Sequence, residues 1–181
     1  MQNSTSQLPL KQSIVLVGLM GAGKTRIGRS LAEDIGLPFV DADTEIEKAA
    51  GCSISDIFDR YGEGAFRDGE RKVMQRLLEE SPHVIATGGG AFMNDETRAL
   101  IKEKALSIWL NAPVDVLHER TSRTNHRPLL QNGDSHAILS HLHEKRSPVY
   151  AQADIEIDSA AASVIKTVDA ITKSIIKFYK D

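Results

Sequence analysis

The chain has 181 residues, of which 41% are hydrophobic and 26% charged, and its formal net charge is −3 at pH 7. These values are typical of one globular domain with a sizeable core, and they give no indication of a nucleic-acid or membrane partner. The single cysteine, Cys52, excludes an internal disulfide and a cysteine-based metal cluster. No stretch approaches the roughly 18 apolar residues of a membrane span. We expect a disordered tail over residues 1–11, one domain over residues 12–181, and a cytoplasmic monomer.

The first motif lies between a predicted strand over residues 13–17 and a helix whose apolar residues recur at helical spacing. Residues 18–25 read Gly-Leu-Met-Gly-Ala-Gly-Lys-Thr and fit the phosphate-binding pattern G-x-x-x-x-G-K-S/T. In such a loop the backbone N–H groups and the lysine hold nucleotide phosphates, and the threonine hydroxyl binds Mg²⁺. The predicted nucleotide contacts are Gly21, Ala22, Gly23, Lys24, Thr25 and Arg26.

Two aspartates follow the second predicted strand, residues 37–40. If the strand continues, Asp41 and Asp43 share one face at its carboxyl end, where open α/β sheets bind ligands. One carboxylate could support Mg²⁺, directly or through a water, and the other could accept a substrate proton. The alternative is that Asp43 caps a helix over residues 44–50 and that Asp41 is a solvated loop acid. Beside a phosphate-binding loop we favour the functional interpretation.

Residues 54–78 predict two helical pieces broken at Gly62 and Gly64. On the second piece Arg67 and Arg71 share a face with an acidic neighbour, which is typical of a solvated ion-pair surface, and we prefer that interpretation for Arg71.

Arg67 has a second interpretation. It follows Phe66 and lies close in sequence to Phe58, so it could stand in an aromatic-walled pocket. There its guanidinium would suit a carboxylate ligand.

The third predicted strand, residues 83–87, ends in three glycines that allow a ligand to approach the backbone, Gly88, Gly89 and Gly90. Many phosphate-loop enzymes carry a magnesium-binding aspartate at the end of this strand, but here Thr87 occupies that place. This absence favours Asp41 as the acid that serves the metal.

Two further strands are predicted over residues 105–110 and 153–158, and an amphipathic helix closes the chain. Five strands alternating with helices predict an α/β fold with a parallel sheet covered on both faces. The helix before the last strand is expected to stop at Ser147-Pro148, and Trp109 and Tyr150 are expected to pack in the core. Three histidines match no standard metal-site spacing and are expected to face solvent: His136, His141 and His143.

Residues 120–134 are polar and contain three arginines within eight positions. Little in this segment could pack into a core, so we expect a mobile lid over residues 121–135. A cationic lid would exclude water and supply positive charge during phosphoryl transfer. The alternative is a solvated basic loop, but with the phosphate-binding loop present we favour the lid.

In order and spacing these motifs resemble those of shikimate kinase over residues 14–158. The phosphate-binding loop is shared by many enzymes, whereas Phe-Arg-x-x-Glu, a triple glycine and Arg-Pro-Leu-Leu in this order are much more specific. The resemblance is carried by residues 18–25, by Asp-Ala-Asp-Thr-Glu-Ile-Glu at 41–47, Phe-Arg-Asp-Gly-Glu at 66–70, Thr-Gly-Gly-Gly at 87–90, Arg-Pro-Leu-Leu at 127–130 and Arg-Ser-Pro-Val-Tyr at 146–150.

The resemblance implies a three-layer P-loop NTPase-type fold like that of nucleoside monophosphate kinases. Its five-stranded parallel sheet would have the order 2-3-1-4-5, with substrate-binding helices over residues 43–80. It also implies an enzyme that phosphorylates the 3-hydroxyl of shikimate with ATP, giving shikimate 3-phosphate and ADP on the route to chorismate and aromatic amino acids. The implied ligands are shikimate, ATP and Mg²⁺.

On the acceptor side, the resemblance implies that Asp43 binds the substrate hydroxyls and acts as the base. Arg67 and Arg146 resemble the pair that grips the shikimate carboxylate. The other implied contacts are the backbone of Gly88, Gly89 and Gly90, with Gly89 the direct one, and the rings of Phe58 and Phe66.

On the donor side, Lys24 resembles a catalytic residue that neutralises the γ-phosphoryl group, and Arg127 resembles the lid arginine that reaches both this group and the substrate. Arg120 resembles the residue that stacks near adenine. Thr25 and Asp41 resemble the magnesium ligands, Asp41 through a water. The loop over residues 159–163 departs from the family pattern because its side chains are small, so we expect base contacts from the backbone.

Two other classes of function stay open. Gluconate kinase or a nucleotide kinase could share this fold, although a nucleotide kinase would need a second base-binding pocket. A non-catalytic nucleotide-binding module would not need the lid arginines, and the chain lacks the Asn-Lys-x-Asp motif of a guanine-nucleotide switch.

Overall fold

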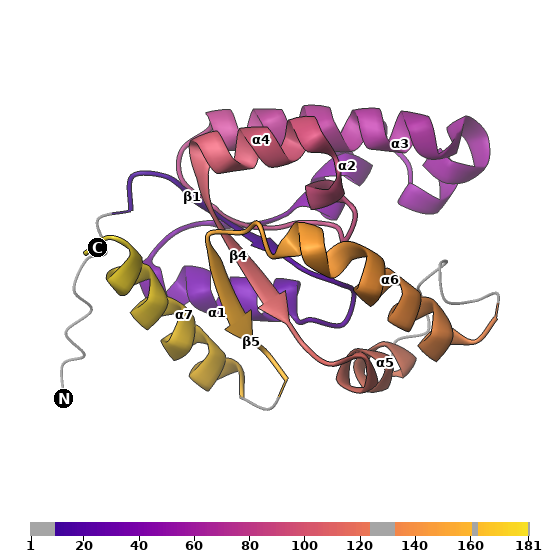
Figure 1. Ribbon diagram of the computed structural model, residues 1–181. Helices are drawn as coiled ribbons and strands as arrows, with labels where there is room; N and C mark the ends of the chain where they lie inside the picture. Colours follow the sequence, from indigo (N-terminus) through magenta and orange to yellow (C-terminus); the bar gives the residue numbers. More distant parts are fainter. Residues whose placement is uncertain (1–9, 124–132, 161–162, 181) are drawn as a thin grey trace.

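The computed structural model describes residues 10–123, 133–160 and 163–180. Five strands form one parallel sheet in the order β2-β3-β1-β4-β5 (Figure 1). This order confirms the predicted topology and the α/β class. The strands are β1 Ser13–Val17, β2 Phe39–Asp41, β3 Val84–Ala86, β4 Ala105–Asn111 and β5 Ile155–Asp158.

Helices cover both faces of the sheet, with α1 and α7 packed together on one side and α3 and α4 on the other (Figure 1). A sheet covered on both faces needs apolar strands, and β1 and β3 are buried at every position. None of the helices in the described part of the chain is long and apolar enough to span a membrane. The helices are α1 Lys24–Ile35, α2 Ala42–Ala50, α3 Ile54–Glu79, the short 3₁₀-helix η1 Ala91–Met93, α4 Asp95–Lys104, α5 Val114–Ser122, α6 Ser135–Tyr150 and α7 Val164–Phe178.

Three neighbouring strands end in register at one edge of the sheet. Asp41 at the end of β2 lies opposite Ala86 at the end of β3, and Ala86 lies opposite Leu16 of β1. Adjacent strands are about 4.8 Å apart, so the segments that follow them leave the sheet side by side. These segments are the aspartate pair, the triple glycine and the phosphate-binding loop.

The second strand ends sooner than its sequence predicts. It stops at Asp41, whose Oδ1 accepts hydrogen bonds from the backbone N–H groups of Asp43 (3.0 Å) and Thr44 (3.2 Å) and so caps α2. The expected extended geometry of residues 41–43 is therefore wrong, and so is the alternative in which Asp43 is the cap. A capping residue must precede the first helical residue, and Asp41 holds that position.

Of the two breaks predicted in α3, the one at Gly62 is confirmed, because this residue leaves helical geometry with φ 80° and ψ 175°. The predicted break at Gly64 is wrong, because the helix continues through it. The predicted stop at Ser147-Pro148 is also wrong, because α6 runs on to Tyr150. Pro148 stands in the last turn, where the loss of one backbone donor does not end the helix.

The packed domain begins within the segment predicted as a tail. Leu10 packs against the hydrophobic core, and the side-chain amide of Gln12 donates a hydrogen bond to the hydroxyl of Tyr179 at 2.8 Å. Residues 1–9 lie outside the described part of the chain.

Candidate active site

Glycines shape the phosphate-binding loop between β1 and α1. Gly18, Gly21 and Gly23 have φ angles of 143°, 85° and 94°, which favour glycine over residues with side chains. A Cβ atom at Gly18 would also lie 2.6 Å from the carbonyl oxygen of Leu110. The first turn of the helix that follows presents N–H groups that have no acceptor within the helix, and together with the helix dipole they favour a phosphate.

Lys24 lies over this loop. Its Nζ donates hydrogen bonds to the carbonyl oxygens of Gly18 at 2.7 Å and Leu19 at 3.0 Å. The ammonium group therefore stands beside the backbone groups that would surround a bound phosphate. Arg26, also predicted to bind nucleotide, is exposed in the first turn of α1.

The two predicted magnesium ligands lie in contact. The hydroxyl of Thr25 donates to Oδ2 of Asp41 at 2.9 Å. A hydroxyl and a carboxylate oxygen side by side are donors of the kind that Mg²⁺ prefers. Thr87 stands at the position where an acid was sought, and its hydroxyl donates to the carbonyl oxygen of Leu16 at 2.8 Å.

The first glycine of the triple-glycine loop lies against two carboxylates. A Cβ atom at Gly88 would be 2.9 Å from Oδ1 of Asp43 and 3.3 Å from Oε2 of Glu70. Asp43 comes from the first turn of α2 and Glu70 from the middle of α3, so the loop brings together acids from two elements.

The second and third glycines lie against the two predicted carboxylate-binding arginines. A Cβ atom at Gly89 would be 3.1 Å from Nη1 of Arg146, and one at Gly90 would be 2.5 Å from Nη1 of Arg67. The three consecutive glycines are thus explained by close contact with a different site side chain at each position. The loop gathers Asp43, Arg67 and Arg146 around one short stretch of backbone.

Arg67 is held by acids of its own helix. Its Nη1 donates to Oε1 of Glu70 at 2.9 Å, and its Nη2 lies 3.4 Å from Oε1 of Glu63. A guanidinium has five N–H donors, so these two contacts orient it and leave donors for a carboxylate ligand. Arg71 instead pairs with the exposed acids Asp68 and Glu96, which confirms the predicted ion-pair surface.

Glu70 is the site residue that the sequence analysis missed. It is 2% exposed, and Oε2 has no hydrogen-bond partner among the described residues. Burial raises the pKa of its carboxyl above the ordinary value, Arg67 opposes that rise, and the nearby Asp43 charge adds to it. A signal was present, since Glu70 falls on the apolar stripe Phe66, Val73 and Leu77, where a charge needs a partner.

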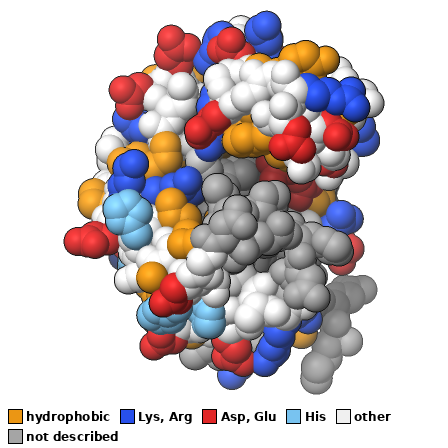
Figure 2. All heavy atoms as spheres, turned by 90° about the vertical axis from the view of Figure 1, so that its right-hand side faces the viewer, with side chains coloured by type: hydrophobic (Ala, Val, Ile, Leu, Met, Phe, Trp, Pro, Cys, Tyr) orange, Lys and Arg blue, Asp and Glu red, His pale blue; other side chains and the backbone are white. Residues whose placement is uncertain are grey.

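An aromatic pair borders Arg67. The rings of Phe58 and Phe66 lie 4.9 Å apart, and the guanidinium carbon of Arg67 is 5.1 Å from the Phe66 ring. Phe66 is buried, whereas Phe58 is 38% exposed. Figure 2 views the molecule from the right-hand side of Figure 1, and on that face acidic, basic and hydrophobic side chains stand close together.

The bend that brings Phe58 back onto Phe66 occurs at Gly62. This residue has φ 80° and ψ 175°, a combination that essentially only glycine adopts. The short arm over residues 54–61 therefore turns back beneath the rest of α3 (Figure 1).

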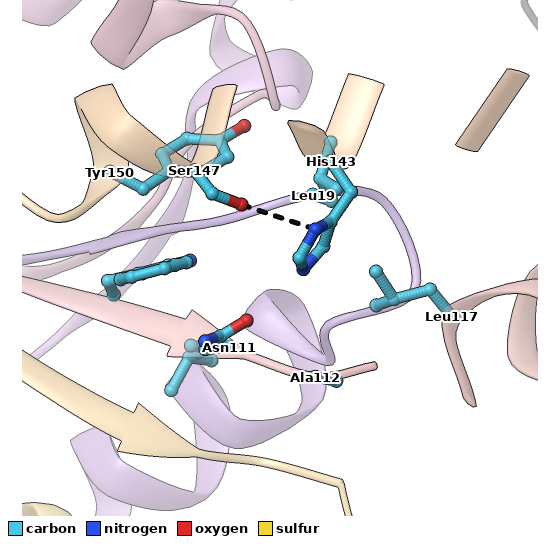
Figure 3. A pocket seen from close by; sticks show the side chains of 9 residues that line it. Leu19, Asn111, Ala112, Leu117, His143, Ser147 and Tyr150 are labelled. Atoms are coloured by element: carbon cyan, nitrogen blue, oxygen red, sulfur yellow. Dashed lines mark hydrogen bonds between the residues drawn. The ribbon is translucent and has the colours of Figure 1, made fainter. Parts of the chain in front are cut away.

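The last turns of α6 lie against the end of β4 and the phosphate-binding loop. Figure 3 shows Tyr150, Ser147 and His143 from α6 around a small pocket that is also lined by Leu19. His143 is half-buried and its Nδ1 lies 3.4 Å from the Ser147 hydroxyl, so the expectation that it faces solvent is wrong. His136 and His141 are exposed as predicted.

Tyr150 packs in the core as predicted, since it is 1% exposed and its ring lies 5.9 Å from that of Trp109. The sequence did not indicate its hydrogen bond. The hydroxyl donates to the carbonyl oxygen of Gly89 in the triple-glycine loop.

Arg120 ties the phosphate-binding loop to the loop after β5. Its guanidinium donates to the carbonyl oxygens of Ser159 (2.7 Å), Ala160 (3.0 Å) and Gly21 (3.3 Å). The resemblance implied stacking near adenine, and this role of Arg120 stays a prediction. Residues 161–162 of the loop lie outside the described part of the chain.

The predicted lid falls largely outside the described residues. Residues 124–132, including the predicted catalytic Arg127, are not among them. Two side-chain contacts join α5 and α6, the helices that precede and follow this range. Nε2 of His118 lies 2.9 Å from the Ser135 hydroxyl, and Nε2 of His136 lies 2.7 Å from Oδ1 of Asp115.

Comparison with protein families gives a match to one family over most of the chain. The sequence model of the family described as "Shikimate kinase" matches residues 20–179. A curated shikimate kinase of Caulobacter vibrioides is 56% identical over 164 residues, which cover 90% of this chain and 82% of that protein.

Two solved structures illustrate the likeness in three dimensions. A shikimate kinase from Acinetobacter baumannii in complex with shikimate has a TM-score of 0.90 and 36% identity, and the match covers 96% of this chain and 97% of that one. A gluconokinase from Sinorhizobium meliloti has a TM-score of 0.60 and 22% identity, over 92% of this chain and 93% of that one. The second likeness shows a shared fold alone.

Proposed function

The chain belongs to the shikimate kinase family, and from this premise we propose that its site transfers the γ-phosphoryl group of ATP to the 3-hydroxyl of shikimate. The products are ADP and shikimate 3-phosphate. The observation that carries the proposal is the triple-glycine loop, which lies against Asp43, Arg67 and Arg146. The same loop approaches the phosphate-binding loop, because a Cβ atom at Gly89 would lie 3.7 Å from the carbonyl oxygen of Gly18.

The acceptor is held by charge and shape. Arg67 and Arg146 bind the shikimate carboxylate, since guanidinium groups match the fork of a carboxylate. The backbone of Gly88 to Gly90 lies against the ring, and Phe58 and Phe66 wall it. Glu70 holds Arg67 in place through the 2.9 Å ion pair.

Asp43 is the base in this proposal. It orients the 3-hydroxyl, whose oxygen forms a bond to the γ-phosphorus as the bond from that phosphorus to the β,γ-bridging oxygen breaks. ADP leaves with the bridging oxygen, and the hydroxyl proton passes to the Asp43 carboxylate.

The donor is held mainly by backbone. Loop N–H groups and the first turn of α1 bind the phosphates, and Lys24 exchanges its carbonyl contacts for phosphate oxygens. We also assign Arg127 to the transferring group, on the strength of the family resemblance. Arg120 orders the base-binding edge of the site through its three backbone contacts.

Thr25 and Asp41 would hold Mg²⁺, Asp41 through a water. Among the described residues no three His, Cys, Asp or Glu side chains form a metal site by themselves. Mg²⁺ commonly keeps several waters and uses one or two protein oxygens together with substrate phosphates, and the contact between Thr25 and Asp41 fits that pattern. The ion would neutralise charge on the β- and γ-phosphates.

We further propose one domain that works as a cytoplasmic monomer without nucleic-acid or membrane partners. The small net charge and the single cysteine support this. Light scattering of the purified protein at working concentration would test the monomer, and a dimer mass would contradict it.

A coupled ADP-release assay tests the reaction. Shikimate, gluconate and nucleoside monophosphates are offered separately with ATP and Mg²⁺. We expect turnover with shikimate alone. Turnover with gluconate in place of shikimate would overturn the assignment, and ATP binding without turnover on any acceptor would indicate a binding module.

A further inference from the structure

Tyr150 has a buried hydroxyl that the proposed reaction does not use. The residue is 1% exposed, and its ring packing against Trp109 would be equally available to a phenylalanine. A buried hydroxyl is unfavourable unless it is hydrogen-bonded, and here it donates to the carbonyl oxygen of Gly89. The hydroxyl therefore needs an explanation apart from core packing.

Arg146 lies one helical turn before Tyr150, on the same face of α6. Both side chains reach the same point of the triple-glycine loop. A Cβ atom at Gly89 would lie 3.1 Å from Nη1 of Arg146 and 3.8 Å from the Tyr150 hydroxyl oxygen. Burial raises the pKa of the Tyr150 hydroxyl, and the positive charge of Arg146 opposes that rise.

Gly89 in turn lies next to the donor side. Its Cβ position is 3.7 Å from the carbonyl oxygen of Gly18, the same oxygen that accepts a hydrogen bond from Lys24. A displacement of Gly89 would change the position of the acceptor relative to the phosphate.

We propose that Tyr150 is a positioning residue: its hydroxyl fixes Gly89 and Arg146 relative to each other, in the arrangement that the acceptor carboxylate requires. The hydroxyl touches neither substrate and acts through the loop and the arginine. This inference rests on the proposed function, since it assigns Arg146 to the carboxylate of shikimate.

Tyr150→Phe tests the inference because it removes only the hydroxyl. We expect the KM for shikimate to rise about 2- to 10-fold, the effect of one neutral hydrogen bond, while the KM for ATP stays within about twofold. Tyr179→Phe is the matched control, since it also removes a hydroxyl with one hydrogen bond, at the far end of α7. It should leave both constants unchanged.

A second variant tests the same contact without touching the tyrosine. Gly89→Ala places a methyl group 3.1 Å from Arg146 Nη1 and should also raise the KM for shikimate. If both variants disturb one arrangement, the double variant should show less than the product of the two single effects.

Two results would overturn the inference. One is a Tyr150→Phe enzyme with the shikimate KM of Tyr179→Phe. The other is a Tyr150→Phe enzyme whose KM values for shikimate and ATP rise in equal proportion as its melting temperature falls, which is the behaviour of a purely structural residue. A wild-type enzyme without shikimate turnover would instead overturn the proposed function.

Discussion

The proposed donor and acceptor halves of this site differ in how they are built. The donor half is one short loop whose shape is set by three glycines with positive φ and by the start of α1. The acceptor half is made of side chains from three elements, with Asp43 on α2, Arg67 and Glu70 on α3, and Arg146 on α6.

This difference has a physical consequence. A backbone loop anchored between a buried strand and a helix has few ways to move, and Cβ atoms at Gly18 and Gly21 would lie 2.6 and 2.9 Å from backbone carbonyl oxygens. Long charged side chains are held instead by ion pairs and burial, so each acceptor contact depends on a particular neighbour. Substitutions in the donor half should therefore affect ATP binding and stability, whereas substitutions in the acceptor half should mainly affect the KM for shikimate or, at the proposed base Asp43, kcat.

The largest effect should come from Asp43→Asn. The amide cannot accept the hydroxyl proton, so kcat should fall about 10²- to 10⁴-fold while the affinity for ATP is retained. Steady-state kinetics and calorimetric ATP titration would measure both. Asp169→Asn, an exposed change on α7, serves as the control. An unchanged kcat would remove Asp43 as the base.

Gly18→Ala should damage the donor half and the fold together. The new Cβ would lie 2.6 Å from the Leu110 carbonyl oxygen in addition to the strain of φ 143°. We expect a loss of roughly 3 kcal/mol or more in the free energy of unfolding, with weaker ATP binding. Gly36→Ala also has positive φ but meets no atom within 4 Å, so it should cost only about 1 kcal/mol. Equal losses in urea denaturation would show that the close contact is unimportant.

Arg67→Lys should affect the acceptor half alone. Loss of one charge-assisted hydrogen bond costs about 1.5–3 kcal/mol, which corresponds to a rise in shikimate KM of roughly 10- to 100-fold. The KM for ATP should stay the same. Arg71→Lys, on the exposed face of the same helix, is the matched control. A shikimate KM equal to that of the control would place the carboxylate elsewhere.

Gly62→Ala should straighten or strain the bend in α3. Its backbone conformation is open to glycine almost alone, so we expect a loss of about 1–3 kcal/mol in stability and a higher shikimate KM. Gly64→Ala, in regular helix with no atom within 4 Å of the new Cβ, should stabilise by about 0.5–1 kcal/mol. If both variants stabilise the protein, the bend is not imposed by Gly62.

Glu70→Gln should separate stability from substrate binding. Because burial raises the pKa of Glu70, the folded protein holds this proton more tightly than the unfolded chain. Wild-type stability therefore falls as pH rises from the unfolded value of 4.5 through the folded pKa. Glutamine does not titrate. The melting temperature of the variant minus that of wild type should therefore increase as pH rises from 4.5 through the folded pKa of Glu70.

The same variant should raise the shikimate KM, because an amide holds Arg67 less firmly than a carboxylate does. Melting curves from about pH 5 to about pH 8 and steady-state kinetics measure the two effects. A melting-temperature difference that is constant over this range would show that Glu70 does not titrate differently in the folded protein.

The strands and the donor half could be predicted because their signals are local, whereas the strand order came from the family resemblance. Short apolar runs mark most of the strands, and the phosphate-binding loop is one continuous motif. The acceptor half was less predictable, because its residues depend on which side chains are buried in the folded protein. The helical spacing of α3 predicts Glu70 on the same exposed ion-pair face as Arg67 and Arg71, yet Glu70 is buried. Tyr150 was expected only to pack, and its bond to Gly89 depends on α6 continuing past Pro148.

The remaining errors arise where two neighbouring residues of the same type could each take one structural role. The end of β2 depended on which of two neighbouring aspartates capped α2, and spacing alone cannot decide between them. The bend in α3 depended on which of two glycines left helical geometry, although both have the same intrinsic freedom.

The position of α2 and α3 between β2 and β3 bears on how such an enzyme changes over evolutionary time. Residues 42–79 form one uninterrupted stretch that carries Asp43, the aromatic wall, Arg67 and Glu70. The phosphate-binding loop lies wholly outside it. Exchange or gradual divergence of this single stretch, with adjustment at Arg146, could alter the acceptor while the inherited ATP machinery stays intact.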